Sequence, residues 1–230
     1  MKLPLGILPL GTANDLARTL HIPNDPVEAA RVIVAGHCRT IDLGQANEQF
    51  FFNVASVGLS EEISRRLSGE MKKRWGVLAY LWTAMQVLRQ TRPFRVAINC
   101  DGDVWSGRTV QVAVGNGRFY GGGMTISENA LIDDGHLDLY SLEVRRPWQI
   151  FGLARALRKG TLSGRNFVRT GTGVEIHVTT QHVKNVNTDG EITTTTPVTF
   201  RVIPSAIRVF TPEFAPGDGT QPERTDATSA

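Results

Sequence analysis

The N-terminal part of the chain has a hydrophobic pattern typical of a strand, a turn and a helix. Ile7 and Leu8 are apolar and lead into Pro9, which fixes its own φ, and Gly11, which permits a positive φ. Apolar residues then recur at helical spacing over residues 13–20. We therefore expect a strand, a glycine turn and a short helix in this order.

Further helices are predicted where apolar residues keep a helical period. The clearest covers residues 27–35, where Asp25 can cap the first turn, Pro26 suits the first helical position and Gly36 stops the helix. The same criterion predicts helices over residues 60–68, 75–90 and 148–159.

From residue 94 onward the period of the pattern changes to two. Residues 94–100 alternate, Asp101 and Gly102 turn the chain, and residues 109–114 are expected to pair back. An earlier strand, residues 39–43, ends at Gly44. Other strands are predicted over residues 49–57, 137–142, 174–179, 183–187, 199–203 and 206–211. Many short strands with Gly and Asp turns predict a mainly antiparallel β-sandwich.

Composition is that of a globular protein. The 230 residues are 41% hydrophobic and 20% charged, and no apolar run approaches the ~20 residues that cross a bilayer. The net charge of +3 is compatible with an anionic membrane surface or a nucleotide. Cys38 and Cys100 have no paired spacing and are interpreted as free thiols in a reducing compartment. The polar, Pro/Gly-rich residues 213–230 are predicted to be disordered.

Several chemistries are not supported by the motifs. The five histidines lack metal-ligand spacing, so zinc is not expected, and no G-x-S-x-G elbow of a hydrolase occurs. Basic residues are not interleaved with stacking aromatics, which argues against nucleic acid.

The turn at Gly11 is the first candidate site. A strand, a glycine turn and a helix start leave backbone N–H groups free for an anion such as phosphate. Thr12 is in the place of an N-cap, and Asn14, Asp15 and Arg18 add an amide, a carboxylate and a guanidinium. The alternative is a capped helix in which Asp15 only complements the helix dipole.

Two acidic turns are the other candidates. Asp189 and Glu191 flank Gly190 after the strand over 183–187, where an Asp-Gly pair also commonly forms a simple hairpin. Asp133 and Asp134 precede the strand over 137–142, where the alternatives are a metal site and a type I′ turn. Several carboxylates close together would raise one pKa and attract Mg²⁺.

Strings along most of the chain resemble the diacylglycerol kinase catalytic-domain family. Leu-Pro-Leu-Gly-Thr-Ala-Asn-Asp-Leu-Ala-Arg at residues 8–18 is the longest, followed by Ile-Asp-Leu-Gly at 41–44 and Phe-Asn-Val-Ala-Ser-Val-Gly at 52–58. The segment at 129–138, the Asp-Gly-Glu at 189–191 and the Thr-Pro pattern from 196 to 209 also match. The Gly-Gly-Asp-Gly-Thr phosphate loop of the family is missing here.

The resemblance implies a role for each candidate residue. In the family pattern Asp189 is the general base for a lipid hydroxyl, with Glu191 as its neighbour, and Asp15 and Asp42 complete the acidic cluster. Asp134, with Asp133 as runner-up, is implied as a metal ligand. The cofactors implied are ATP, bound with the help of Gly11, Thr12, Asn14 and Arg18, and Mg²⁺.

The resemblance also implies an organisation and a function. We expect an α/β remnant of the nucleotide-binding domain over residues 1–42, a β-sandwich over 43–212 and a tail over 213–230, α+β overall. The expected reaction is ATP-dependent phosphorylation of diacylglycerol or a related lipid by a cytoplasmic, peripheral membrane protein; a homodimer is left open. The alternative is a non-catalytic lipid-binding module, and without the loop we expect weak ATP binding.

One helix is a candidate for membrane contact. Residues 148–159 carry an apolar side, and Arg155, Arg158 and Lys159 gather towards the C-terminal end. These cations either meet anionic headgroups or belong to an ordinary helix that covers the sandwich.

Overall fold

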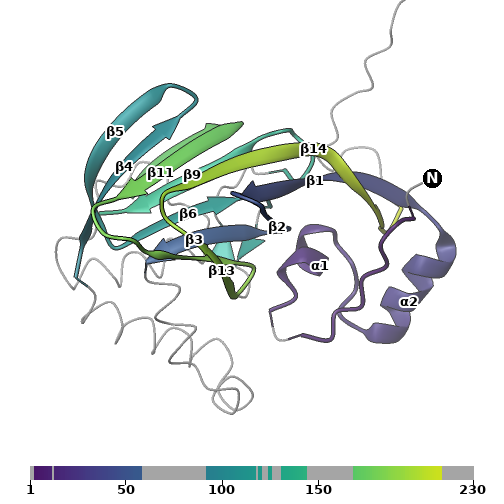
Figure 1. The fold of residues 1–230 in the computed structure, drawn as a ribbon. Helices are drawn as coiled ribbons and strands as arrows, with labels where there is room; N and C mark the ends of the chain where they lie inside the picture. Colours follow the sequence, from purple (N-terminus) through teal and green to yellow (C-terminus); the bar gives the residue numbers. More distant parts are fainter. Residues whose placement is uncertain are drawn as a thin grey trace, which may run out of the picture.

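The computed structural model describes residues 3–11, 13–58, 92–117, 119–120, 124–125, 131–143 and 168–213. The helices predicted over 60–68, 75–90 and 148–159, and the tail beyond residue 213, lie outside these residues. Two six-stranded antiparallel sheets face each other in the described part, with two helices beside one end (Figure 1). The prediction of a mainly antiparallel β-sandwich is confirmed. Neither described helix is long and apolar enough to span a bilayer.

Each sheet combines strands that are far apart in the sequence. The first sheet has the order β2-β1-β14-β11-β4-β5, and the second has the order β10-β9-β6-β3-β12-β13. The strands of the first sheet are β1 (Cys38–Ala46), β2 (Gln49–Phe51), β4 (Phe94–Cys100), β5 (Asp103–Thr109), β11 (Glu175–Thr180) and β14 (Val198–Phe210). Those of the second are β3 (Val54–Gly58), β6 (Gln111–Gly115), β9 (Leu137–Leu142), β10 (Val168–Gly173), β12 (Asn185–Thr188) and β13 (Glu191–Thr195). A two-stranded ribbon pairs β7 (Phe119–Tyr120) with β8 (Met124–Thr125).

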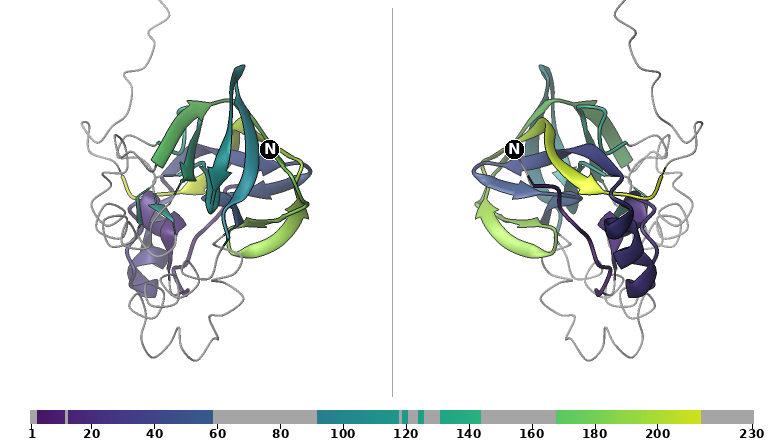
Figure 2. Two further views of the ribbon diagram at one scale, coloured as in Figure 1. Left: turned by 90° about the vertical axis from the view of Figure 1, so that its left-hand side faces the viewer. Right: turned by 90° about the vertical axis from the view of Figure 1, so that its right-hand side faces the viewer.

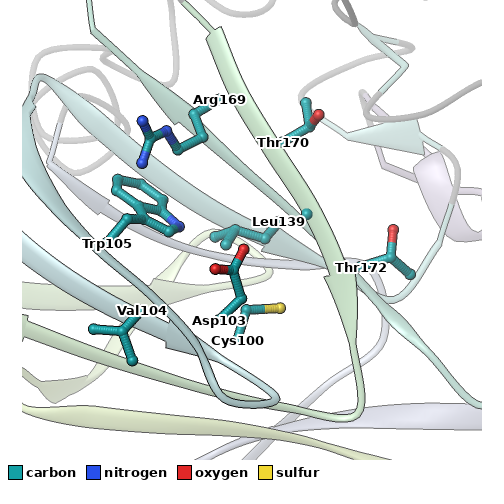
Figure 3. Close-up of a pocket in the computed structure, with 9 residues that line it drawn as sticks. Cys100, Asp103, Val104, Trp105, Leu139, Arg169, Thr170 and Thr172 are labelled. Atoms are coloured by element: carbon teal, nitrogen blue, oxygen red, sulfur yellow. The ribbon is translucent and has the colours of Figure 1, made fainter.

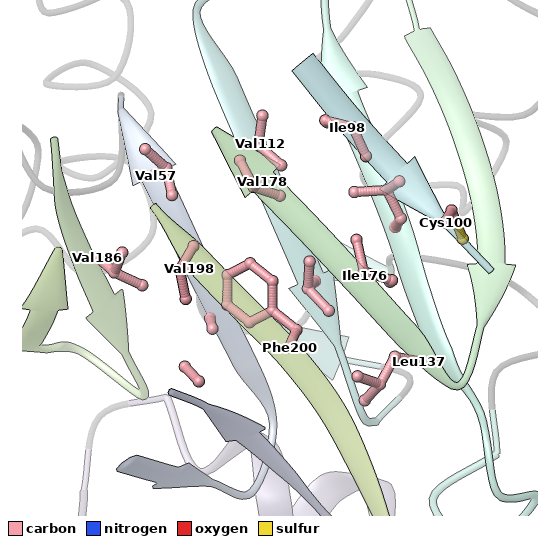
Figure 4. Packing of buried hydrophobic residues seen from close by; sticks show 14 of the residues in the cluster. Val57, Ile98, Cys100, Val112, Leu137, Ile176, Val178, Val186, Val198 and Phe200 are labelled. Carbon is pink, nitrogen blue, oxygen red and sulfur yellow. The ribbon is translucent and has the colours of Figure 1, made fainter. Parts of the chain in front are cut away.

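The main core lies between the two sheets. Alternating residues of the first sheet point inward, so that Ile98, Ile176 and Phe200 are fully buried (Figure 4). Phe51 meets Phe200 edge to face, with ring centroids 6.4 Å apart. Burial of this inward set from both sheets supplies the hydrophobic stabilisation of the sandwich.

The two helices pack beside the sandwich, against the end of β1 and β14 (Figures 1 and 2). Helix α2 (Pro26–Ala35) begins as predicted, because Asp25 accepts hydrogen bonds from the N–H groups of Val27 and Glu28 at 2.9 and 3.0 Å. Gly36, at φ 79°, ends it. Helix α1 (Asp15–Thr19) is short, and its N-cap residue is Asn14.

The prediction that residues 109–114 pair with residues 94–100 is wrong. A two-residue turn at Asp101 and Gly102 places Asp103 opposite Cys100, so β5 begins there and pairs with β4. The chain then crosses to the second sheet, where β6 lies between β3 and β9. The crossing is stabilised by Thr109, whose buried hydroxyl contacts the carbonyl oxygens of Gln111 and Leu142.

Two further strand boundaries differ from the prediction. The strand predicted to stop at Gly44 continues to Ala46, because the Phe51 ring packs directly on the Gly44 backbone in the neighbouring strand. The predicted strand over 49–57 is divided: β2 belongs to the first sheet and β3 to the second. Phe52 and Asn53 form the link between them, and we call residues 52–54 the crossing link.

A bulge interrupts the pairing of β1 with β14. Ile41 lies opposite Ile207, whereas Leu43 lies opposite Ile203. Ser205, at φ 50°, is in the extra stretch of β14, so the two strands predicted over 199–203 and 206–211 form one bent strand. Asp42 lies at this bulge, inside β1. The domain division proposed at Asp42 stays a prediction.

Candidate functional site

Asp189 lies at the tip of the hairpin that joins β12 and β13. Asp189 and Gly190 have φ angles of 48° and 104°, as a tight two-residue turn requires. The Asn187 side chain supports the turn by accepting a hydrogen bond from the Gly190 N–H at 2.9 Å. The hairpin interpretation of this Asp-Gly pair is therefore correct, and the carboxylate has a separate set of contacts.

The Asp189 carboxylate accepts three backbone hydrogen bonds from the crossing link. The N–H of Phe52 donates to Oδ2 at 2.6 Å, and those of Asn53 and Val54 donate to Oδ1 at 3.0 and 3.1 Å. The residue as a whole is exposed at the turn, but its carboxylate faces the link. These contacts fix the orientation of the carboxylate relative to both sheets.

The charge of Asp189 is opposed by its surroundings. Desolvation of the carboxylate raises the pKa of Asp189 above its ordinary value, and the three N–H groups offset only part of this rise. The negative charge of Asp15, in the first turn of α1, raises the pKa of Asp189 further. The structure therefore brings together Asp15 and Asp189, which are 174 positions apart in the sequence.

Asp42 has a different set of contacts. It is 3% exposed, and its two oxygens accept hydrogen bonds from the N–H groups of Gly135 and Ser205, both at 2.7 Å. Asp42 thus holds the bulge of β14 and the turn that carries Asp134. The catalytic role implied for Asp42 stays a prediction, and its contacts are those of a structural carboxylate.

The two metal-ligand candidates, Asp133 and Asp134, lie in the same turn and have different contacts. Asp133 forms an ion pair with Arg39 at 2.5 Å, so a cation already neutralises it. Asp134 accepts a hydrogen bond from the His136 N–H at 3.0 Å, and burial raises the pKa of Asp134. The described residues contain no group of three or more His, Cys, Asp or Glu side chains arranged for a metal ion. Asp134 remains the better candidate.

In the described residues, the candidate phosphate turn uses its polar groups in hydrogen bonds within the turn. The Gly11 N–H donates to Asn14 Oδ1 at 2.9 Å, and Asn14 Nδ2 donates to the Pro9 carbonyl at 3.1 Å. Asn14 has a left-handed φ of 50° and does not cap α1 with its side chain. Thr12 lies outside the described residues, and Arg18 is in the last turn of α1. Glu191 begins β13 and is exposed. The nucleotide-binding role of Gly11, Thr12, Asn14 and Arg18 stays a prediction, as does the catalytic role of Glu191.

Two asparagines at the site were not singled out by the sequence analysis. Asn116, 2% exposed, follows β6, and Asn53 is in the crossing link. The Oδ1 atoms of both are buried and have no hydrogen-bond partner among the described residues. Asn53 lies in the string over residues 52–58 that the sequence analysis noted, but the string does not show what the side chain contacts.

A pocket lies elsewhere in the sandwich, between the edge strands β5 and β10. Its volume is about 560 Å³, and its lining includes none of the predicted site residues. The Arg169 guanidinium lies over the Trp105 ring, 4.5 Å from its centroid (Figure 3). Asp103 and Leu139 add a carboxylate and an apolar wall. This mixed lining is separate from the contacts of the Asp189 carboxylate.

Two family models match the chain. Residues 53–211 match the YegS C-terminal NAD kinase beta sandwich-like domain, and residues 1–46 match the diacylglycerol kinase catalytic domain. A probable lipid kinase YegS-like from Pseudomonas putida is 31% identical over 212 residues, which are 92% of this chain and 70% of that protein. A diacylglycerol kinase from Staphylococcus carnosus is 28% identical, with 91% of this chain and 68% of that protein covered.

Solved structures agree with these sequence matches. The crystal structure of a diacylglycerol kinase from Bacillus anthracis str. Sterne has a TM-score of 0.67 at 26% identity, with 87% of this chain and 64% of that chain covered. Another structure from the same organism reaches a TM-score of 0.74 at 31% identity, with 87% and 67% covered. The chain therefore belongs to the family of YegS-like and diacylglycerol lipid kinases.

Proposed function

We propose that this chain provides the general base of a lipid kinase, with Asp189 as the residue that accepts the proton of the lipid hydroxyl. The observation that carries the proposal is the Asp189 carboxylate itself, which three backbone N–H groups hold in place beside Asp15. The family supports phosphoryl transfer from ATP to diacylglycerol or a related lipid as the reaction.

The environment of Asp189 suits a base. A raised pKa makes the ionised carboxylate a better proton acceptor than an ordinary aspartate at the same pH. The crossing link prevents the carboxylate from rotating, so a hydroxyl that approaches the exposed turn meets an oriented oxygen. Asp15 adds negative charge near this position.

The donor atoms of the site suit Mg²⁺ better than a triphosphate. Carboxylate and amide oxygens, such as those of Asp15 and Asn53, are hard oxygen ligands of the kind that Mg²⁺ prefers. When bound, Mg²⁺ would neutralise charge on the transferred phosphoryl group. The Gly11 N–H is already used by Asn14, so the described turn offers few donors to phosphate. We expect this chain alone to bind ATP weakly.

The closed turn at Gly11 favours a second candidate function, a lipid-binding module without catalysis. Both functions imply a lipid ligand and contact with a membrane surface from the cytoplasm, and both leave the assembly state, a homodimer included, to measurement. They differ in whether a lipid hydroxyl is phosphorylated.

The test is transfer of labelled phosphate from ATP to diacylglycerol in mixed micelles. Asp189→Asn keeps the shape and tolerates the positive φ but cannot accept the proton, so kcat should fall about 10²–10⁴-fold. Asp101→Asn is a matched control, because Asp101 has the same φ of 48° in an Asp-Gly hairpin and also binds two backbone N–H groups. If the wild type is active and Asp189→Asn stays within a few-fold of it, as Asp101→Asn should, Asp189 is excluded as the base. A wild-type chain that binds lipid vesicles without phosphorylating lipid would favour the binding module.

A further inference from the structure

Two residues of the crossing link, Phe52 and Asn53, are not held by strand ladders, whereas Val54 already pairs with Gly115 of β6. Phe52 and Asn53 lie between β2 of one sheet and β3 of the other, so they have no neighbouring strand of their own. Their N–H groups bind Asp189, and their carbonyl oxygens need donors on the other side. The shorter of these bonds come from Asn116, and the Gly117 N–H adds a longer one to the Asn53 carbonyl at 3.4 Å.

Asn116 binds the link through its main chain and its side chain. Its backbone N–H donates to the Asn53 carbonyl at 2.8 Å, and Nδ2 donates to the Phe52 carbonyl at 3.0 Å. The same Nδ2 donates to the Asp42 carbonyl at 3.0 Å, which ties the link to β1. Asn116 is 2% exposed, so these donors do not exchange partners with bulk water.

The contacts of the Asn116 side chain show that the fold uses its N–H donors. Nδ2 has two hydrogens and two carbonyl acceptors, whereas Oδ1 is buried without a partner among the described residues. A buried acceptor without a donor is unfavourable. Among the described residues, the cost of this buried oxygen is therefore offset by the two hydrogen bonds that Nδ2 of the same amide donates. A residue of equal size without N–H donors would not replace Asn116.

The hairpin at Asp101 and Gly102 binds a backbone that is held in a different way. Asp101 binds the N–H groups of Val174 and Glu175, and Glu175 is paired within the ladders of β11. There the partner backbone is already fixed by its strand. At Asp189 the partner backbone is the crossing link, and Asn116 takes the place of a ladder.

We propose that Asn116 is a positioning residue that fixes the crossing link, and through it the orientation of the Asp189 carboxylate. The proposal deepens the proposed function and depends on it for the importance of Asp189 in catalysis. The contact between Asn116 and the link is a separate matter, which can be measured in a protein without activity.

The first test is amide hydrogen exchange by NMR on the whole chain. Asn116→Leu keeps the branched shape and removes both side-chain donors without adding charge. Exchange of the N–H groups of residues 52, 53 and 54 should become at least about tenfold faster, while those of residues 174 and 175 stay within about twofold. Asn99→Leu is the matched control, because Asn99 supports the Asp101 hairpin as Asn187 supports the Asp189 hairpin. Uniform acceleration of all amides in Asn116→Leu would overturn the proposal.

A reciprocal measurement remains decisive if Asn116→Leu does not fold. Asp189→Asn loosens the link from its other side, so the Asn116 side-chain N–H groups should exchange about tenfold faster than in the wild type. Unchanged exchange at Asn116 would show that the two residues do not hold the same link.

The second test is a kinetic double-mutant cycle in the lipid kinase assay. If Asn116 acts through Asp189, Asn116→Leu lowers kcat about tenfold or more in the wild type and has no further effect in Asp189→Asn. A structural role alone would lower activity equally in both backgrounds. If the wild-type chain does not phosphorylate lipid, the proposed function fails and the exchange experiment still decides the role of Asn116.

Discussion

Asp138 shows how a single carboxylate can lower stability in this sandwich. It is half-buried in β9, and its Oδ1 accepts a hydrogen bond from the Thr172 hydroxyl at 3.1 Å. Desolvation raises the pKa of Asp138 despite this bond, and the charge of Asp134 adds to the rise. The folded state therefore holds the Asp138 proton more tightly than the unfolded chain does.

We predict that Asp138→Asn stabilises the protein at neutral pH. Because the folded pKa is raised, ionised Asp138 opposes folding at pH values above it, and this penalty disappears as pH falls below the unfolded value near 4. Asparagine keeps the acceptor for Thr172 without the charge, so Tm should rise by about 2–4 °C at pH 7. The gain should vanish near pH 3.5, and a gain of equal size at both pH values would contradict the electrostatic explanation.

The residue scale also shows where sequence reasoning reaches its limit. Residues 99–102 and 187–190 are both Asn-x-Asp-Gly, and both form hairpins in which the Asn side chain accepts a hydrogen bond from the Gly N–H. Local chemistry predicts the turns correctly and cannot distinguish them. They differ in the backbone that each carboxylate meets, strand β11 or the crossing link, and that depends on how distant strands pair.

At the scale of elements, alternation identified many of the strands, missed β5, β10 and β13, and failed at several strand ends. The pattern in residues 94–100 and the caps of α2 were sufficient, because local sterics and hydrogen bonds determine them. The sequence predicts a strand end at Gly44, since glycine is common in turns. In the structure Gly44 lies within β1 opposite Phe51 of the edge strand β2, and this contact has no signal in the sequence around Gly44.

We predict that Gly44→Ala destabilises the pairing of β1 with β2. An added Cβ would come within 2.1–2.6 Å of three ring atoms of Phe51, which is 1% exposed and has no room to move. Such overpacking costs about 1–3 kcal/mol, measurable as a lower denaturant midpoint. The control is Gly107→Ala in β5, where the nearest atom is a Glu143 oxygen at 3.5 Å, and its effect should stay within about 0.5 kcal/mol. Equal effects at both positions would rule out the Phe51 contact as the cause.

The described residues of the molecule form two hydrophobic cores of different origin. The main core lies between the sheets, whereas a smaller one joins α1 and α2 to Ile41 and Val209 at the end of β1 and β14. The class of fold was predictable because alternation over many strands is a global signal. The smaller core was not, because its members come from α1, α2, β1 and β14 and from the loop residues Leu20, Ile22 and Ile132.

We predict that the smaller core unfolds separately when it is weakened. Leu20 is fully buried between the helices and the strand ends, so Leu20→Ala removes a side chain that only this core contains. The substitution should lower the stability of the smaller core by about 2–5 kcal/mol. A ten-residue helix such as α2 is not stable in water without such packing, so α2 should unfold when this core is weakened. Amide exchange in α2 should accelerate strongly, while that of β6 and β11 in the main core should change little.

The control is Val178→Ala in the main core. It should accelerate exchange in both parts, because α2 loses its support when the sandwich opens. Uniform acceleration in Leu20→Ala would mean that the two cores unfold as one cooperative unit.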